Sequence, residues 1–151
     1  MNPLQILPMD EQSIPQVHEL EEICFASPWS KRSLRQMLND PLAVCYTAQS
    51  GGEVVGYIGM HCIFGEGHIL NLAVAPTHRR RGIANILLET LLTYARKHDF
   101  TLLTLEVRAS NMAAIALYWG LGFISVGLRR GYYDTPREDA LIMTLEIGET
   151  Q

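Results

Sequence analysis

The sequence predicts an α/β (α+β mixed) fold, a single domain with a twisted mixed sheet of about seven strands and about four helices. Two observations predict it. Short apolar runs separated by glycine turns occupy residues 42–75. Residues 82–98 then repeat apolar positions at helical spacing, and a further apolar run follows over 101–107. A strand, a helical crossover and a second strand indicate one parallel pair beside antiparallel hairpins.

The first half of the chain is expected to form an edge strand, two helices and three more strands. Asp10 and Ser30 stand where the two helices need N-caps, and Pro15 suits a first helical turn. Glycines in Ser50-Gly51-Gly52-Glu53 and Gly65-Glu66-Gly67 supply hairpin turns. The expected strands cover residues 5–9, 42–49, 54–64 and 68–75.

The second half is expected to alternate helices and strands. A long helix over 82–98 presents an apolar stripe made of Ile83, Leu87, Leu88, Leu91, Leu92 and Ala95. A strand over 101–107, an alanine-rich helix over 111–121 and strands over 123–128 and 140–147 follow. Residues 129–139 are expected to be a loop. Because no repeat or linker interrupts the sequence, we expect one domain over 1–151.

Composition and charge exclude several classes of protein. Hydrophobic residues make up 48% and charged residues 19% of the 151, which is ordinary for a globular chain. The net charge of −4 disfavours general nucleic-acid binding and suits a basic partner. No apolar run is long enough to cross a membrane, and residues 1–10 lack a secretion-signal pattern. We therefore expect a cytoplasmic monomer with no membrane or nucleic-acid partner.

The cysteines and histidines do not suggest a metal site. Cys24, Cys45 and Cys62 are odd in number and widely spaced, and the five histidines show no ligand pairing. The cysteines are expected to be small buried hydrophobes in a reducing compartment. Cysteine catalysis is the less favoured alternative.

Residues 70–84, L-N-L-A-V-A-P-T-H-R-R-R-G-I-A, place a strand, a basic glycine turn and a helix start in succession. The first turn of a helix leaves backbone N–H groups without partners, and its dipole favours anions. Arginine and glycine there let a phosphate approach the backbone. The alternatives are a solvated charged loop and a nucleic-acid patch. We expect a phosphate-bearing ligand on Arg79, Arg80, Arg81, Gly82, Ile83, Ala84 and Asn85.

Glu106, in L-E-V-R, is the candidate general base. It stands near the end of the strand after the long helix, where open α/β sheets build their sites. Its apolar neighbours would partly desolvate the carboxylate, which suits proton abstraction. An ion pair with Arg108 explains the residue equally well. His68 is a weaker candidate for substrate contact, because a surface role explains it more simply.

Asn111 and Tyr118 are expected to line one cleft. They are separated by about two helical turns and so face the same side of their helix. A phenol can donate a proton to a leaving group, while a core tyrosine with a satisfied hydroxyl is the alternative. Ser110 is expected to cap this helix. The absence of a Gly-x-Ser-x-Gly motif leaves serine hydrolase chemistry unsupported.

Several motifs together resemble one family. The turn R-R-R-G-I-A at 79–84 matches the [QR]-x-x-G-x-[GA] motif of the GNAT acyltransferases, with L-A-V-A-P before it and N-M-A-A-I-A-L-Y-W-G-L-G-F after it. The chain resembles the RimI-type ribosomal-protein alanine N-acetyltransferases more closely still. That resemblance is carried by F-A-S-P-W-S at 25–30, L-E-V-R-A-S-N at 105–111, A-L-Y at 116–118, R-R-G-Y-Y at 129–133 and E-D-A-L-I-M at 138–143.

The resemblance implies acetyl-CoA as donor and a role for each candidate residue. The basic turn would hold the pyrophosphate, Asn111 would contact the cofactor, and the pantetheine would pair like an added strand with Leu72, Ala73 and Val74. Glu106 would be the general base, through water, and Tyr118 the acid that protonates the departing thiolate. The acceptor's first residues would be held by Phe25, Trp29, Ser30, Tyr132, Tyr133 and Asp134.

The resemblance further implies acetyl transfer to the α-amino group of the N-terminal alanine of a small-subunit ribosomal protein. The acidic net charge suits the basic tail of such an acceptor. An α-amine near pKa 8 is about a tenth deprotonated at pH 7, against on the order of one in a few thousand for lysine, so a modest base suffices. Other protein N-termini, lysines or small amines are alternative acceptors. A non-catalytic CoA- or RNA-binding module is the alternative of another class.

Overall fold

The structure is a computed structural model that describes residues 3–148. In that range the chain forms four α-helices and one seven-stranded sheet in the order β1-β2-β3-β4-β5-β7-β6. The strands are β1 (Leu4–Pro8), β2 (Ala43–Ser50), β3 (Glu53–Ile63), β4 (Glu66–Val74), β5 (Leu102–Arg108), β6 (Ile124–Asp134) and β7 (Arg137–Glu146). The helices are α1 (Ile14–Cys24), α2 (Lys31–Leu38), α3 (Ile83–Lys97) and α4 (Met112–Gly120). The predicted single mixed α/β sheet is confirmed.

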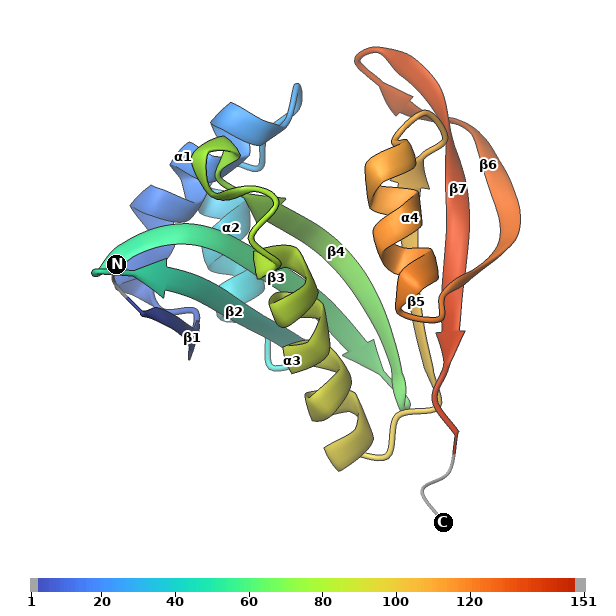
Figure 1. Cartoon of the computed structure of the whole chain (residues 1–151), viewed down its shortest axis with the longest axis horizontal. Helices are drawn as coiled ribbons and strands as arrows, with labels where there is room; N and C mark the ends of the chain where they lie inside the picture. The colour runs from blue at the N-terminus through green and yellow to red at the C-terminus, as the bar shows by residue number, and fades with distance from the viewer. Residues whose placement is uncertain (1–2, 149–151) are drawn as a thin grey trace.

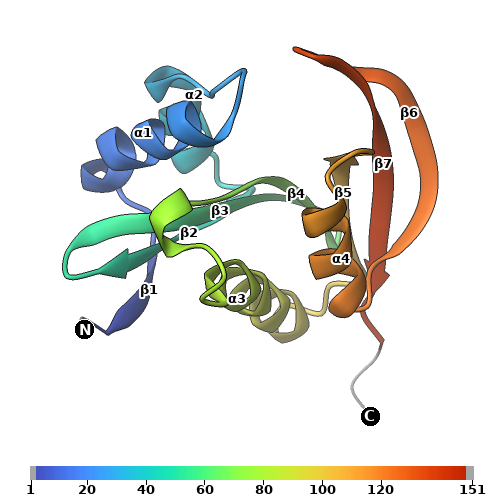
Figure 2. The same ribbon diagram turned by 45° about the horizontal axis from the view of Figure 1, so that its top comes forward.

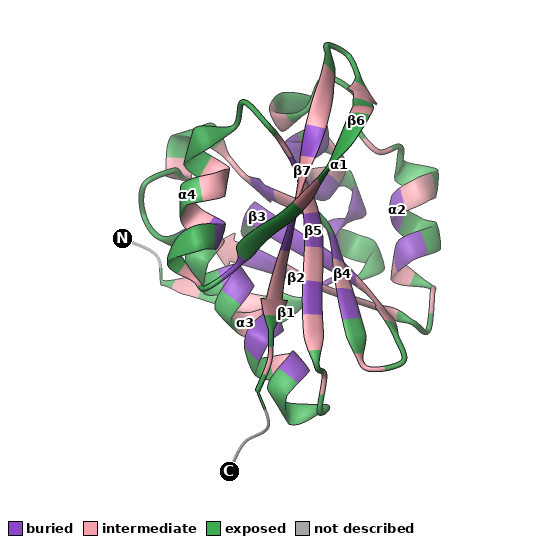
Figure 3. Ribbon diagram, turned by 90° about the vertical axis from the view of Figure 1, so that its right-hand side faces the viewer, coloured by how far each residue is buried: buried purple, intermediate pink, exposed green. Residues whose placement is uncertain are grey.

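The helices cover both faces of the sheet. Figures 1 and 2 show α1 and α2 on one face and α3 and α4 on the other. The predicted apolar stripe of α3 is buried against the sheet, and Leu87, Leu88 and Leu91 are fully covered. A second core forms where α1 and α2 meet the opposite face around Ile14 and Leu34. The edge strand β6 is mostly exposed, whereas β3 is mostly buried and buried residues alternate with less buried ones along β4 and β5 (Figure 3).

Local sequence signals account for most helix starts. The Asp10 carboxylate accepts from the Ser13 backbone N–H at 3.0 Å and caps a short 3-10 turn that leads into α1. The Ser30 hydroxyl accepts from the Ser33 N–H at 3.1 Å and caps α2. For α4 the prediction was wrong, because the cap is Asn111, not Ser110. The Asn111 side chain accepts from the third residue of the helix at 3.2 Å.

The C-terminal hairpin is longer than expected. Residues 129–139 are not a loop, because β6 runs to Asp134 and β7 begins at Arg137. The two strands stay paired to their ends, and Tyr133 is opposite Glu138. A register shift between Arg129 and Tyr133 interrupts the ladder. The turn is therefore reduced to residues 135–136, and the predicted substrate residues of this region lie on a strand.

The parallel pair of β4 and β5 is short and opens at the centre of the sheet. β4 pairs with β5 only from Glu66 to His68, opposite Leu102 to Thr104. Beyond this point β4 stays paired with β3, and β5 stays paired with β7. Figure 1 shows the two strands separating toward the end of the molecule where α3 begins. We call the opening between residues 69–74 of β4 and 105–108 of β5 the splay.

Candidate active site

The splay leaves one edge of β4 without a strand partner among residues 3–148. The Ala75 N–H donates to the Val55 carbonyl of β3 at 2.8 Å, which sets the direction of the alternating backbone groups. The backbone N–H and C=O groups of Ala73 therefore point to β3, while the same groups of Leu72 and Val74 point into the splay. Extended ligands with amide groups can pair with such an edge as an added strand.

The basic turn before α3 presents backbone rather than a side-chain cap. Gly82 is the N-cap of α3 with φ of +76°, and no side chain in the described part of the chain caps this helix. Its positive φ favours glycine, whereas space does not require it, because an added Cβ would meet no atom of the described residues within 4 Å. Arg80 is also left-handed, with φ of +65°. Arg80, Arg81 and Asn85 are exposed and Ala84 is half-buried, so the turn offers cationic side chains and free N–H groups to an anion.

Two of the predicted ligand residues direct their side chains elsewhere. Arg79 donates from Nε to the Val74 carbonyl at 3.2 Å and from Nη2 to the Cys24 Sγ at 3.6 Å. The Ile83 side chain is buried in the core under α3. In this arrangement Arg79 joins the end of β4 to the end of α1, and Ile83 can meet a ligand only through its backbone.

Glu106 lies two residues beyond the last parallel pair of β5, on the face of the sheet that α1 and α2 cover. Its side chain is only 11% exposed. The His68 Nε2 is 2.5 Å from Glu106 Oε2, and the Arg129 Nε is 3.4 Å from Oε1. The alternative ion pair with Arg108 does not form. Arg108 instead binds Glu138 at 3.3 Å and two carbonyls of the hairpin turn. Glu106 is thus a largely covered carboxylate at the splay, in a position that a general base could use.

Tyr118 lies on the inner side of α4 and is 8% exposed. Its ring packs against Phe123 with centroids 5.7 Å apart. Burial, and secondarily the neighbouring Tyr133, raise the pKa of Tyr118 to about 12. The phenol therefore keeps its proton at neutral pH and can act as a donor.

The two predicted acceptor-binding segments project from the same end of the molecule, at the α1–α2 connection and the β6–β7 tip (Figures 1 and 2). In the first, Phe25 is 39% exposed and Trp29 is half-buried, while the Ser30 hydroxyl caps α2. In the second, the Arg108 guanidinium lies 4.3 Å from the centre of the Tyr133 ring. Tyr132 meets Tyr133 edge-on and is 48% exposed, and Asp134 is exposed at the tip.

A buried carboxylate beside the splay was missed from the sequence. Glu21 of α1 is 1% exposed and accepts from the Tyr57 hydroxyl at 2.5 Å, the Asn71 Nδ2 at 3.2 Å and the Trp29 N–H at 2.8 Å. The Asn71 Oδ1 is buried and has no hydrogen-bond partner among residues 3–148. The signal was available, because Glu21 follows Val17 by one helical turn and so lies on the buried face of α1. His68 and Arg129 were missed as partners of Glu106.

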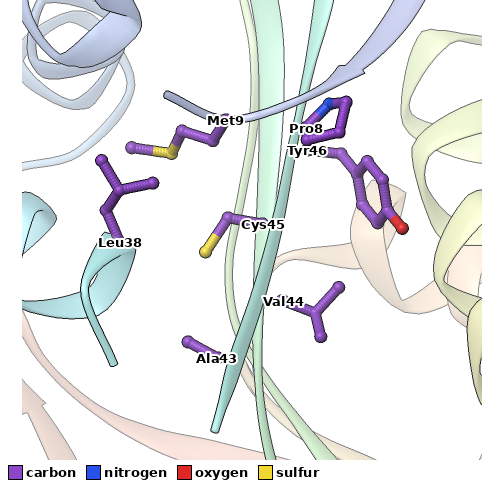
Figure 4. Close-up of a pocket in the computed structure, with 7 residues that line it drawn as sticks. All are labelled: Pro8, Met9, Leu38, Ala43, Val44, Cys45 and Tyr46. Carbon is purple, nitrogen blue, oxygen red and sulfur yellow. The ribbon is translucent and has the colours of Figure 1, made fainter. Parts of the chain in front are cut away.

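One of the three cysteines reaches the splay, because the Cys24 thiol donates to the Val74 carbonyl at 3.5 Å. All three are free and half-buried rather than fully buried as expected. Cys45 lines a hollow of about 240 Å³ between the β1–β2 edge and α2, where its thiol faces Met9 and Leu38 (Figure 4). Burial raises the pKa of Cys45 to about 11, so the thiol is not a nucleophile at neutral pH.

No group of three or more His, Cys, Asp or Glu side chains within residues 3–148 is arranged to hold a metal ion. None of the helices in that range is long and apolar enough to cross a membrane.

The comparisons with known proteins agree with this geometry. Residues 14–123 match the model of the acetyltransferase (GNAT) family. The ribosomal protein bS18-alanine N-acetyltransferase of Escherichia coli K12 is 35% identical over 142 residues, covering 93% of this chain and 95% of that protein. The crystal structure of the E. coli ribosomal-protein-S18-alanine N-acetyltransferase superposes with a TM-score of 0.92 at 32% identity, covering 99% and 97%.

A third similar protein is a chain from the crystal structure of the NatC complex bound to Gag peptide and CoA. It is 28% identical, has a TM-score of 0.85 and covers 98% of this chain and 100% of that chain. The free edge of β4 and the uncapped start of α3 fit an extended, phosphate-bearing donor. The chain belongs to the acetyltransferase (GNAT) family and is an acetyl-CoA-dependent N-acetyltransferase.

Proposed function

We propose that the protein acetylates the α-amino group of an N-terminal alanine on a small-subunit ribosomal protein, in the cytoplasm. The observation that carries the acceptor class is the similarity to the E. coli enzyme across 93% of the chain. The net charge of −4 supports it, because the tails of ribosomal proteins are basic. The exposed aromatic side chains at the α1–α2 connection and on the β6–β7 hairpin supply contact area for a peptide.

In the proposed reaction, Glu106 and Tyr118 handle the two protons of the acceptor amine. Bound acetyl-CoA supplies a thioester, whose carbonyl carbon accepts the amine's electron pair and whose thiolate leaves. Glu106 takes one proton from the ammonium form, through water, and so produces the free base that attacks. Tyr118 gives its proton to the departing sulfur and is reprotonated from the nitrogen. The net products are the acetylated amine, CoA thiol and one proton.

The donor would lie between these groups and the basic turn. Leu72 and Val74 would hold the pantetheine through the backbone groups that face the splay. Arg80, Arg81 and the N–H groups of the first turn of α3 would hold the pyrophosphate. Ala73 and Asn111 would complete the contacts, and Asn111 would remain the cap of α4.

A peptide panel tests the acceptor. Basic peptides that begin with Ala, Ser, Gly or Met are incubated with acetyl-CoA, CoA release is measured, and mass spectrometry locates the acetyl group. We expect the Ala peptide to be modified on its α-amine. The matched control is the same peptide with a blocked N-terminus and intact lysines. No CoA release above background with any peptide would refute the proposal, and acetylation of lysine would favour the alternative acceptor class.

The catalytic roles are tested by Glu106→Gln and Tyr118→Phe. Each removes one proton-transfer group, so kcat should fall by about 10²–10⁴-fold while acetyl-CoA affinity changes little. Steady-state kinetics and donor titration measure the two quantities. Glu146→Gln at the far end of β7 and Tyr46→Phe on β2 are the matched controls and should keep normal turnover. If both active-site variants kept normal turnover, Glu106 would not be the general base and Tyr118 would not be the general acid.

A further inference from the structure

His68 and Glu106 form a polar contact at the closed end of the splay. His68 is the last residue of β4 that pairs with β5, opposite Thr104. Its Nε2 reaches across to the Glu106 Oε2 at 2.5 Å, and the two side chains are 39% and 11% exposed. Because an ionised carboxylate can only accept hydrogen bonds, the imidazole N–H is the donor in this contact.

We propose that His68 is the positioning residue of Glu106 and makes the general base respond to pH. This inference rests on the proposed function. Neutral His68 donates one hydrogen bond to Oε2, which fixes the carboxylate and leaves Oε1 for the water that takes the amine's proton. Protonated His68 holds Glu106 in an ion pair, and the carboxylate then accepts a proton less readily. Activity is therefore lost when His68 becomes charged.

The other charged groups around the pair do not duplicate this role. On β6, the Arg129 guanidinium is 3.4 Å from the Glu106 Oε1. The Arg129 side chain is 56% exposed, so the incoming water can displace it. Tyr132 of β6 also lies near Glu106 and Arg129, and burial followed by Glu106 raises its pKa, so it stays neutral. An imidazole is the side chain whose ordinary charge change falls between pH 5 and 8, and neither a guanidinium nor a phenol shares that property.

On the β3 side the neighbour of His68 is a second histidine. His61 is directly opposite His68 in the β3–β4 ladder, so the two side chains share one face of the sheet. His61 Nε2 is 3.2 Å from Asp40 Oδ2 and so has its own carboxylate partner. His61 and Asp40 line a hollow of about 330 Å³ beneath α2, and His68 does not line it. His61 is therefore a matched control, because it is a paired histidine at the same level of the sheet but not a partner of Glu106.

The kinetic test uses His68→Gln, His68→Ala and His61→Gln on the alanine peptide. Glutamine places an amide N–H near the position of Nε2 but cannot become charged. We expect His68→Ala to lose about tenfold in kcat at pH 8 with unchanged KM for acetyl-CoA, and His68→Gln to recover most of it. The fall in kcat/KM from pH 8 to pH 6 should be smaller in His68→Gln than in wild type by a factor of about three or more.

The acceptor amine ionises in the same way in every assay. Differences between the pH profiles of kcat/KM therefore arise from groups of the enzyme. His61→Gln should keep the shape of the wild-type profile. A His68→Gln profile that parallels wild type would overturn the proposal, as would an equal flattening in His61→Gln. A merely structural role predicts a lower Tm in His68→Ala without any change in profile shape for His68→Gln.

A second measurement needs no acceptor. The imidazole N–H of His68 that is hydrogen-bonded to a carboxylate should give a downfield, exchange-protected proton resonance in ¹⁵N-histidine-labelled protein. Glu106→Gln should shift that resonance upfield while the His98 signals stay in place. If no peptide is acetylated but the resonance behaves in this way, the proposed acceptor is wrong and the His68–Glu106 contact stands. An unshifted resonance refutes the positioning role whatever the acceptor is.

Discussion

At the scale of single residues, burial decides what each candidate group can do. Tyr118 is almost fully covered, so its phenolate would lose hydration, and burial raises the pKa of Tyr118 to about 12. Burial also raises the pKa of Cys45 to about 11, so this thiol stays protonated at neutral pH and is a poor nucleophile. A buried phenol is thus kept in the form that can give a proton to a thiolate, whereas a buried thiol is kept in its unreactive form.

The pKa of Tyr118 predicts the alkaline side of the pH–rate profile. A proton donor is lost only as the pH rises through its folded-state pKa, so kcat for the alanine peptide should not decline between pH 8 and pH 10. Initial rates at saturating substrates measure this, with circular dichroism as a check that the protein stays folded. A decline below pH 9.5 that Tyr118→Phe does not share would contradict the raised pKa of Tyr118.

At the scale of elements, α1 is joined to the sheet by a polar contact in the middle of an apolar core. The Glu21 carboxylate accepts from Tyr57 of β3, Asn71 of β4 and the Trp29 backbone, so one side chain connects α1, the central strands and the acceptor-side connection. Burial, followed by Glu21, raises the pKa of Tyr57 far above its usual range, so the hydroxyl always donates.

Tyr57→Phe should therefore destabilise the protein. The substitution leaves the buried Glu21 oxygen with fewer donors, which costs about 1–3 kcal/mol of unfolding free energy and lowers Tm by several degrees. Thermal and urea unfolding measure the change. Tyr94→Phe is the matched control, because Tyr94 is a half-buried tyrosine stacked on His98 in α3 and should tolerate loss of its hydroxyl. Equal stability of the two variants would contradict the structural role of Glu21.

At the scale of the whole molecule, the sheet brings the donor and acceptor sides together at the splay. The free edge of β4 and the start of α3 face the same opening, and the two aromatic segments project from that end of the fold (Figure 1). Donor binding should therefore join the two halves of the sheet and stabilise the fold as a unit.

Acetyl-CoA at 100 times its Kd should stabilise the protein by about 2.7 kcal/mol and raise Tm by about 5–10 °C. Structured RNA at the same concentration should leave Tm unchanged, because the arginine turn is one exposed segment on an acidic protein. Differential scanning fluorimetry measures both. Gly82→Ala should reduce the acetyl-CoA shift, since alanine strains the left-handed N-cap. A shift with RNA and none with acetyl-CoA would favour the non-catalytic module.

The sequence by itself determined most of the elements, the fold class and the basic turn, because these depend on local patterns. The helical period of the segment that became α3, the caps Asp10 and Ser30, and the glycine turns each act within a few residues. The motifs that carried the family resemblance are also contiguous stretches, so they could be read without knowing how strands pair. Glu106 and Tyr118 entered the candidate site on the same basis.

Only the tertiary structure decided which side chains face one another. His68 and Glu106 are 38 residues apart, and Arg129 comes from a third strand. Their meeting depends on strand order and register, and a shift of one residue would turn every side chain to the other face. Strand pairing also decides the length of the β6–β7 hairpin and the contacts of Arg108 at its turn, so local sequence patterns did not predict them. Local periodicity specifies a strand, but register across the sheet is a property of the whole packed fold.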